Sequence, residues 1–185
     1  FLQWVDTGMK EGDPAKAPAA QTFGDGGLPG ATDSFSIATP YKVPAGGKDD
    51  IRCFPIDPKL PAGSWITGSN VVAGDSRVVH HAIVYTDPKG EGPSKVDSTG
   101  SYPCFGDPLT SDPSVLLAWA PGAPPLEYGT DSAVKVEDGM HFVLQIHYHP
   151  TSVAVDDQTR FELRTTQTRP KYVTTLLLVG NADGK

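Results

Sequence analysis

Three histidines on one short segment are the residues of this chain best suited to chemistry. The segment 143–150 reads Val-Leu-Gln-Ile-His-Tyr-His-Pro, and a further histidine precedes it at position 141. If residues 140–149 form a strand, alternation places His141, His147 and His149 on one face. The other face is then occupied by Phe142, Leu144, Ile146 and Tyr148. Imidazoles opposite an apolar face are typical either of a solvated surface or of a metal site.

The two remaining histidines, His80 and His81, lie in a second segment with strand character, residues 77–86. If the two segments become neighbours, imidazoles from both can meet, and imidazole binds Cu, Zn, Fe or Ni. Neither segment contains Asp, Glu or Cys, which predicts an all-imidazole site. Adjacent side chains of a regular strand point to opposite faces, so both histidines reach one metal only if the strand bulges or twists there. The alternative, in which one of them faces the core and the other faces solvent, stays open.

Other catalytic templates fit the sequence poorly. A cupin-type metal site would need a Glu three or four residues after the His-x-His pair, but Pro-Thr-Ser-Val follows it. The H-E-x-x-H motif of zinc proteases and the Gly-rich phosphate loop G-x-x-x-x-G-K-[ST] are both absent. Composition leaves room for a Ser-His-Asp triad, but no G-x-S-x-G elbow supports one.

The elements that must position these histidines are short strands. Of the 185 residues, 20 are Gly and 18 are Pro, which is typical of a protein with many turns. Turn-rich stretches separate nine segments with strand character: residues 34–39, 49–55, 64–73, 77–86, 115–120, 133–136, 140–149, 160–164 and 172–179. No helical pattern lies between them, so we predict an all-β, antiparallel β-sandwich of the Greek-key or jelly-roll kind.

The predicted sandwich domain covers residues 34–185, and a length of 185 residues suits a single domain. Residues 1–33 are expected to be an N-terminal linker, or the tail of an upstream domain. Within them we expect a short helix in residues 1–12 and an extended stretch, free or packed on a surface, in residues 13–33. Because the sequence does not begin with Met, we expect it to be part of a longer precursor.

Charge and hydropathy exclude some classes of partner. The net charge is −7 and no basic run is present, which argues against nucleic-acid binding. No apolar segment approaches the ~18 residues needed to span a bilayer. The two cysteines, Cys53 and Cys104, form no C-x-x-C motif, so they are compatible with two thiols or with one disulfide. Composition alone therefore leaves the compartment undecided.

Five sequence blocks follow one another in a characteristic order between about residues 48 and 180. They are Ile51-Arg52-Cys53, residues 78–85 (VVHHAIVY), residues 98–102 (STGSY) leading to Cys104, residues 118–125 (AWAPGAPP) and residues 142–148 (FVLQIHY). In this order and spacing they resemble the copper type II, ascorbate-dependent monooxygenases, the family of peptidylglycine α-hydroxylating monooxygenase and dopamine β-monooxygenase. The resemblance is to the N-terminal one of that family's two jelly-roll domains.

The resemblance implies that His80, His81 and His147 bind one copper ion, with both adjacent histidines turned onto it. It also implies a disulfide between Cys53 and Cys104, and hence an oxidising, extracytoplasmic compartment, periplasmic or secreted.

The other candidate residues near the site are less firmly placed by the resemblance. His149 departs from the eukaryotic pattern, which has glycine at that position, so it is expected to be a fourth ligand or a nearby hydrogen-bonding group. His141 lies about 20 Å from His147 along the strand, and we expect it to be solvated or to support the site indirectly. Gln145 and Tyr85 either brace the ligands or simply pack.

In this family, hydroxylation takes place at a second copper, held by a His-x-His pair and a Met of the following domain. The only methionines here are Met9 and Met140, so the resemblance implies one half of a dicopper monooxygenase, an electron-transfer copper domain whose partner is the missing C-terminal copper domain. Alone, it should hydroxylate nothing. Residues 1–14 resemble the tail of c-type cytochromes fused to bacterial members, so a cytochrome or ascorbate would be the electron donor. The alternative is a non-catalytic copper-binding or interaction module.

Overall fold

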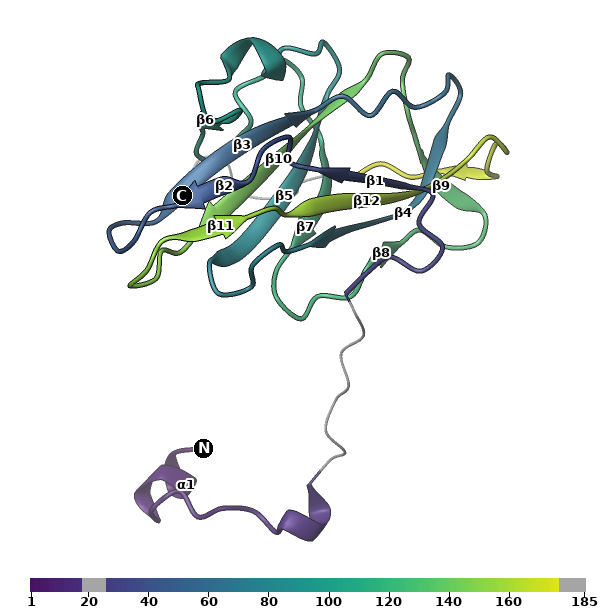
Figure 1. Cartoon of the computed structure of the whole chain (residues 1–185). Helices are drawn as coiled ribbons and strands as arrows, with labels where there is room; N and C mark the ends of the chain where they lie inside the picture. Colours follow the sequence, from purple (N-terminus) through teal and green to yellow (C-terminus); the bar gives the residue numbers. More distant parts are fainter. Residues whose placement is uncertain (18–25, 177–185) are drawn as a thin grey trace, which may run out of the picture.

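The computed structural model describes residues 1–17 and 26–176 of the chain, and 13 strands within them form an all-β sandwich. One layer is a five-stranded antiparallel sheet in the order β6-β3-β10-β5-β7. Both histidine segments belong to this sheet, as neighbours at its centre (Figure 1). Its strands are β3 (Asp50–Ile56), β5 (Val79–Asp87), β6 (Tyr102–Pro103), β7 (Val115–Trp119) and β10 (His141–Tyr148).

The second layer is a six-stranded sheet in the order β1-β12-β4-β9-β13, with β8 also paired to β4. Its pairs are antiparallel except for β13 and β9, which run parallel. The strands are β1 (Asp33–Ser36), β4 (Trp65–Val72), β8 (Leu126–Glu127), β9 (Ser132–Lys135), β12 (Arg160–Thr166) and β13 (Tyr172–Val173). A separate antiparallel ribbon joins β2 (Tyr41–Val43) to β11 (Val155–Asp157). The predicted antiparallel sandwich is thus confirmed apart from one parallel pair.

All nine predicted strands are present, with small differences at their ends. The strand predicted for residues 172–179 is shorter, because β13 ends at Val173, and positions 177–179 lie outside the described residues. Four strands were not predicted, namely β2, β6, β8 and β11. Each has only two or three residues, which is too few for an alternating pattern to be recognised.

The main core lies between the two sheets, and it confirms the apolar face predicted for the histidine strand. Phe142, Leu144, Ile146 and Tyr148 are fully buried. They share one cluster with Ile66 of β4 and with Phe161 and Leu163 of β12. The rings of Phe142 and Phe161 meet edge to face at 5.5 Å between centroids, an arrangement that aromatic pairs favour. This burial fixes which face of β10 carries the imidazoles.

The outer face of the five-stranded sheet carries a second, smaller core built around a disulfide. Cys53 and Cys104 are bonded, with Cα atoms 5.9 Å apart, and they pack with Tyr85, Tyr102 and Val143. The disulfide expected from the family resemblance is therefore present. Much of the face opposite the main core is accordingly buried, and the imidazoles lie at one end of it.

The N-terminal residues agree in part with the expected helix and linker. A short helix, α1 (Leu2–Asp6), and a 3-10 turn, η1 (Pro14–Lys16), are formed, and both are exposed. Residues 26–33 do not form a free linker, because Leu28 is buried and its backbone N–H donates to Glu162 Oε2 at 2.7 Å. The predicted linker residues 18–25 lie outside the described residues. In the part of the chain that is described, no helix is long and apolar enough to cross a membrane.

A charged contact ties the disulfide region to β3. The guanidinium of Arg52, nearly buried, donates to the carboxylate of Asp97 and to the hydroxyls of Thr99 and Ser101. Hydrogen bonds from Thr99, and then from Arg52, lower the pKa of the Asp97 carboxyl to about 2. The segment that precedes Cys104 is thereby held against the sheet.

Candidate metal centre

A β-bulge turns two adjacent imidazoles onto one face of the sheet. His147 of β10 pairs with His81, but the next pair joins Tyr148 to Val79, so His80 is an extra residue in β5. The alternation between buried and exposed residues along β5 is also interrupted at this point. Val79 and the alanine after His81 are buried, whereas His80 is exposed and His81 is half-buried. The bulge needed for a shared site is therefore present, and the alternative that one histidine faces the core is wrong.

The Nδ1 atoms of the three histidines converge at this bulge. His81 Nδ1 lies 3.2 Å from His80 Nδ1 and 3.3 Å from His147 Nδ1. One ligating atom from each residue fits within a group no wider than 4.8 Å. Two nitrogens bound to one ion at about 2.0 Å, with a roughly tetrahedral angle between them, lie about 3.3 Å apart. His80, His81 and His147 can therefore hold one metal ion, as the family resemblance implied.

The orientation and charge of the rings also suit a metal. The three ring planes are inclined to one another by 62° to 81°, so no two of these rings stack face to face. Burial, followed by the neighbouring His147 and His80, lowers the pKa of His81. The neutral imidazole is the form that binds metals. A proton on His81 Nδ1 can be donated to only one of its two neighbours at a time, whereas one cation satisfies all three nitrogens.

Asp49, an acid that was not predicted to be near the site, contacts His147 through the ring nitrogen that points away from the cluster. The carboxylate of Asp49 accepts a hydrogen bond from His147 Nε2 at 2.8 Å and another from His149 Nδ1 at 2.8 Å. These bonds, that of His147 first, lower the pKa of Asp49. Asp49 immediately precedes β3, which runs beside β10 with Ile51 opposite His147. The available signal was Asp49 at the start of the strand predicted for residues 49–55, but the expectation of an all-imidazole site rested only on the two histidine segments.

The other two histidines lie outside the cluster. His149 has a side chain 70% exposed, and its Nδ1 is bonded to Asp49. His149 thus makes the expected hydrogen bond, and it does not belong to the group of side chains that could hold a metal. His141 begins β10 at the opposite end, where it pairs with Asp87 and packs half-buried against Gly90. It is partly buried, and it lies outside the group of side chains that could hold a metal.

The two residues considered as braces contact the disulfide region instead. Gln145 Nε2 donates to Cys104 Sγ at 3.4 Å. The hydroxyl of Tyr85 donates to the carbonyl of Gly106 at 3.3 Å. Both side chains therefore hold the segment around Cys104 rather than the imidazoles.

The backbone that leads into the bulge is fixed by a buried carboxylate. Asp157 accepts hydrogen bonds from the hydroxyl of Tyr148 at 2.8 Å and from the backbone N–H of Asp75 at 2.9 Å. The turn before β5 lies so close to it that a Cβ on Gly74 would come within 2.6 Å of the Asp157 carboxylate and 2.5 Å of the Gln158 nitrogen. The end of β10 and the start of β5 are thus locked together at the end of the sheet where the three imidazoles lie.

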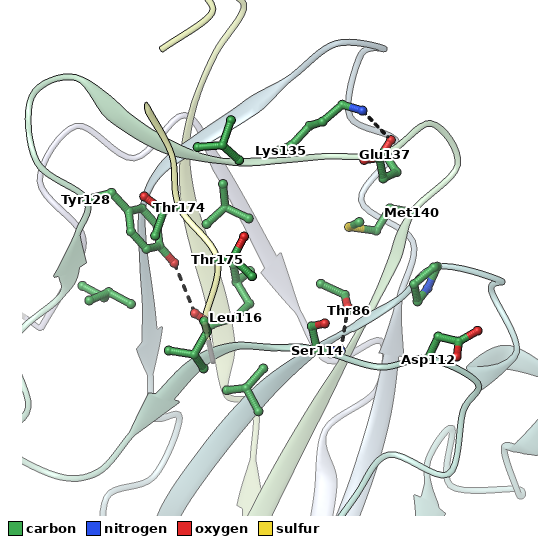
Figure 2. Close-up of a pocket in the computed structure, with 16 residues that line it drawn as sticks. Thr86, Asp112, Ser114, Leu116, Tyr128, Lys135, Glu137, Met140, Thr174 and Thr175 are labelled. Atoms are coloured by element: carbon green, nitrogen blue, oxygen red, sulfur yellow. Dashed lines mark hydrogen bonds and ion pairs between the residues drawn. The ribbon is translucent and has the colours of Figure 1, made fainter. Parts of the chain in front are cut away.

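One hollow of the described surface lies away from the imidazole cluster (Figure 2). It has a volume of about 330 Å³ and is lined chiefly by β7, β9, the residues after β13 and Met140. A Lys135–Glu137 ion pair of 2.8 Å stands at its rim. Its lining is largely apolar and includes none of the five histidines. The three imidazoles are therefore a better candidate for a functional site than this hollow.

No protein-family model matches this chain. The likeness to copper type II monooxygenases thus stays a prediction that rests on the five sequence blocks. The convergence of three imidazoles on a bulge stands independently of it.

Proposed function

We propose that this chain is a mononuclear copper-binding, electron-transfer domain of a dicopper monooxygenase, of the copper type II, ascorbate-dependent kind. The single observation that carries the proposal is the meeting of the Nδ1 atoms of His80, His81 and His147 at the β5 bulge. The order and spacing of the sequence blocks supply the choice of copper, because imidazole alone also suits Zn, Fe and Ni.

The three residues would act together to hold the ion. Bound copper would accept and release one electron, cycling between Cu(II) and Cu(I). Neutral imidazoles suit both oxidation states, and strand pairing on both sides of β10 keeps His147 beside His81 without rearrangement. His80 is exposed, so its ring would bring one edge of the centre to the surface, where a redox partner can approach.

The partners and compartment follow from the same proposal. The electron would pass to a second copper, in a C-terminal domain, where O2 reacts and an organic substrate is hydroxylated. Ascorbate or a c-type cytochrome would be the donor. The Cys53–Cys104 disulfide supports an extracytoplasmic, periplasmic or secreted location, because such bonds persist in oxidising compartments. The isolated chain should bind and cycle copper but hydroxylate nothing.

Copper stoichiometry and reduction test the proposal directly. The chain should bind one copper ion, and ascorbate should abolish the EPR signal of its Cu(II) form. His81→Ala should lose stoichiometric binding, because His81 Nδ1 is the nitrogen that lies close to both of the others. Equal binding by the wild type and the variant would overturn the site.

One observation favours a second candidate, a non-catalytic copper-binding or interaction module. Among the described residues, the three imidazoles are the one group of His, Cys, Asp or Glu side chains arranged to hold a metal. Such a module would bind copper without accepting electrons. Retention of the Cu(II) signal with excess ascorbate would therefore favour the module over the electron-transfer domain.

A further inference from the structure

Asp49 occupies a distinctive position between two imidazoles, one inside the cluster and one outside it. Its Oδ2 lies 2.8 Å from His147 Nε2 and its Oδ1 lies 2.8 Å from His149 Nδ1. The His147 side chain is only 15% exposed, whereas those of Asp49 and His149 are 48% and 70% exposed. The carboxylate thus joins a nearly buried ring to a ring at the surface.

The chemistry of the carboxylate decides which nitrogen of His147 carries the proton. An ionised carboxylate only accepts hydrogen bonds, and a neutral imidazole has one N–H. Because Nε2 faces Asp49, that N–H is on Nε2, which leaves the lone pair on Nδ1. Nδ1 is the atom that lies 3.3 Å from His81 Nδ1. The contact with Asp49 therefore prepares His147 to bind a metal through the nitrogen that faces the cluster.

Neither His80 nor His81 has such a support. Their ring hydrogen bonds run within the cluster, and among the described residues Asp49 is the one carboxylate that contacts a cluster imidazole. His149 in turn binds the second oxygen of Asp49, which limits rotation of the carboxylate.

We propose that Asp49 is the positioning residue of this centre, fixing the tautomer and ring orientation of His147, and that His149 holds Asp49 in place. The inference rests on the proposed metal binding and adds residues that do not touch the ion. The negative charge behind His147 makes its Nδ1 a stronger donor, and it favours Cu(II) over Cu(I). Loss of the carboxylate should therefore weaken binding and raise the reduction potential.

The experiment compares Cu(II) affinity, measured by competition with a chelator, in the whole chain and in three variants. Asp49→Ala removes both hydrogen bonds and the charge, and it should lower affinity about 10- to 100-fold, the usual effect of losing a carboxylate behind a histidine ligand. Asp49→Asn keeps an acceptor oxygen and should lose less. The matched control is Asp156→Asn, which removes the same charge from an exposed position on β11 and should leave affinity unchanged.

A second readout separates positioning from a general loss of structure. ¹⁵N NMR of the metal-free chain, at a pH where imidazoles are neutral, should show His147 protonated on Nε2. Asp49→Ala should show a mixture of both tautomers at His147 with the main core unchanged. The inference is overturned if His147 keeps one tautomer in Asp49→Ala, or if affinity is unchanged while the wild type binds copper. If the wild type binds no copper, it is the proposed function that fails.

Discussion

Replacing His147 with alanine should remove most of the stability that copper adds to the folded chain. In the proposed centre three nitrogens from two strands would hold the ion, and the substitution takes away the one contributed by β10. Among the described residues, no other imidazole belongs to the group placed to hold the ion, so none replaces it without moving. Copper would then be left with two adjacent donors from β5.

The expected size of the effect follows from binding linkage. A ligand present at 100 times its Kd stabilises the folded state by about 2.7 kcal/mol. For a domain of roughly 150 residues, this corresponds to a rise in Tm of about 5–10 °C. If the variant binds 100-fold more weakly, the same copper concentration equals its Kd, and the stabilisation falls to about 0.4 kcal/mol, or about 1 °C.

The assay is a thermal melt of each protein with and without copper, so that each variant is its own reference. His141→Ala is the matched control, because it removes an imidazole from the other end of the same strand, about 20 Å away. It should keep the full copper-induced rise in Tm. A rise in His147→Ala equal to that of the wild type would refute the three-imidazole centre.

Four further variants, one of them a control, test the scaffold by urea denaturation. Cys104→Ser opens a disulfide between residues 51 positions apart and should cost about 4 kcal/mol in the chain-entropy model; an unchanged free energy of unfolding would contradict this. Gly74→Ala places a methyl group 2.5 Å from a backbone nitrogen and should lower the free energy of unfolding by about 1–3 kcal/mol. Its control is Gly129→Ala, which has open space around it and should lower that free energy far less. Equal losses of stability in the two variants would refute the tight turn. The pKa of Asp97 is lowered to about 2, by Thr99 first, so its contribution to stability is present above about pH 4 and is lost as the pH falls towards 2. Wild type should therefore lose more stability than Asp97→Asn over that interval, and parallel pH profiles would contradict the assignment.

The strands and the faces of the histidine segment could be predicted because they depend on local pattern. Turn-rich stretches separated nine segments with strand character. Alternation along residues 140–149 placed Phe142 and Leu144 in the core and His147 on the other face. The four strands that were missed are too short to alternate. The disulfide was predicted from the family resemblance, because two isolated cysteines in a sequence do not show whether they are bonded.

The sequence by itself determined which side chains could bind a metal. It also determined which face of β10 carries His147. Only the tertiary structure decided that His80 and His81 both lie beside His147 and that Asp49 contacts His147. Both facts depend on the register between strands far apart in the chain. The bulge exists because β5 has one residue more than β10 between two pairs, and Asp49 meets His147 because β3 lies along the other edge of β10. Register is set by packing of the whole sheet, so a pattern read along one strand does not contain it.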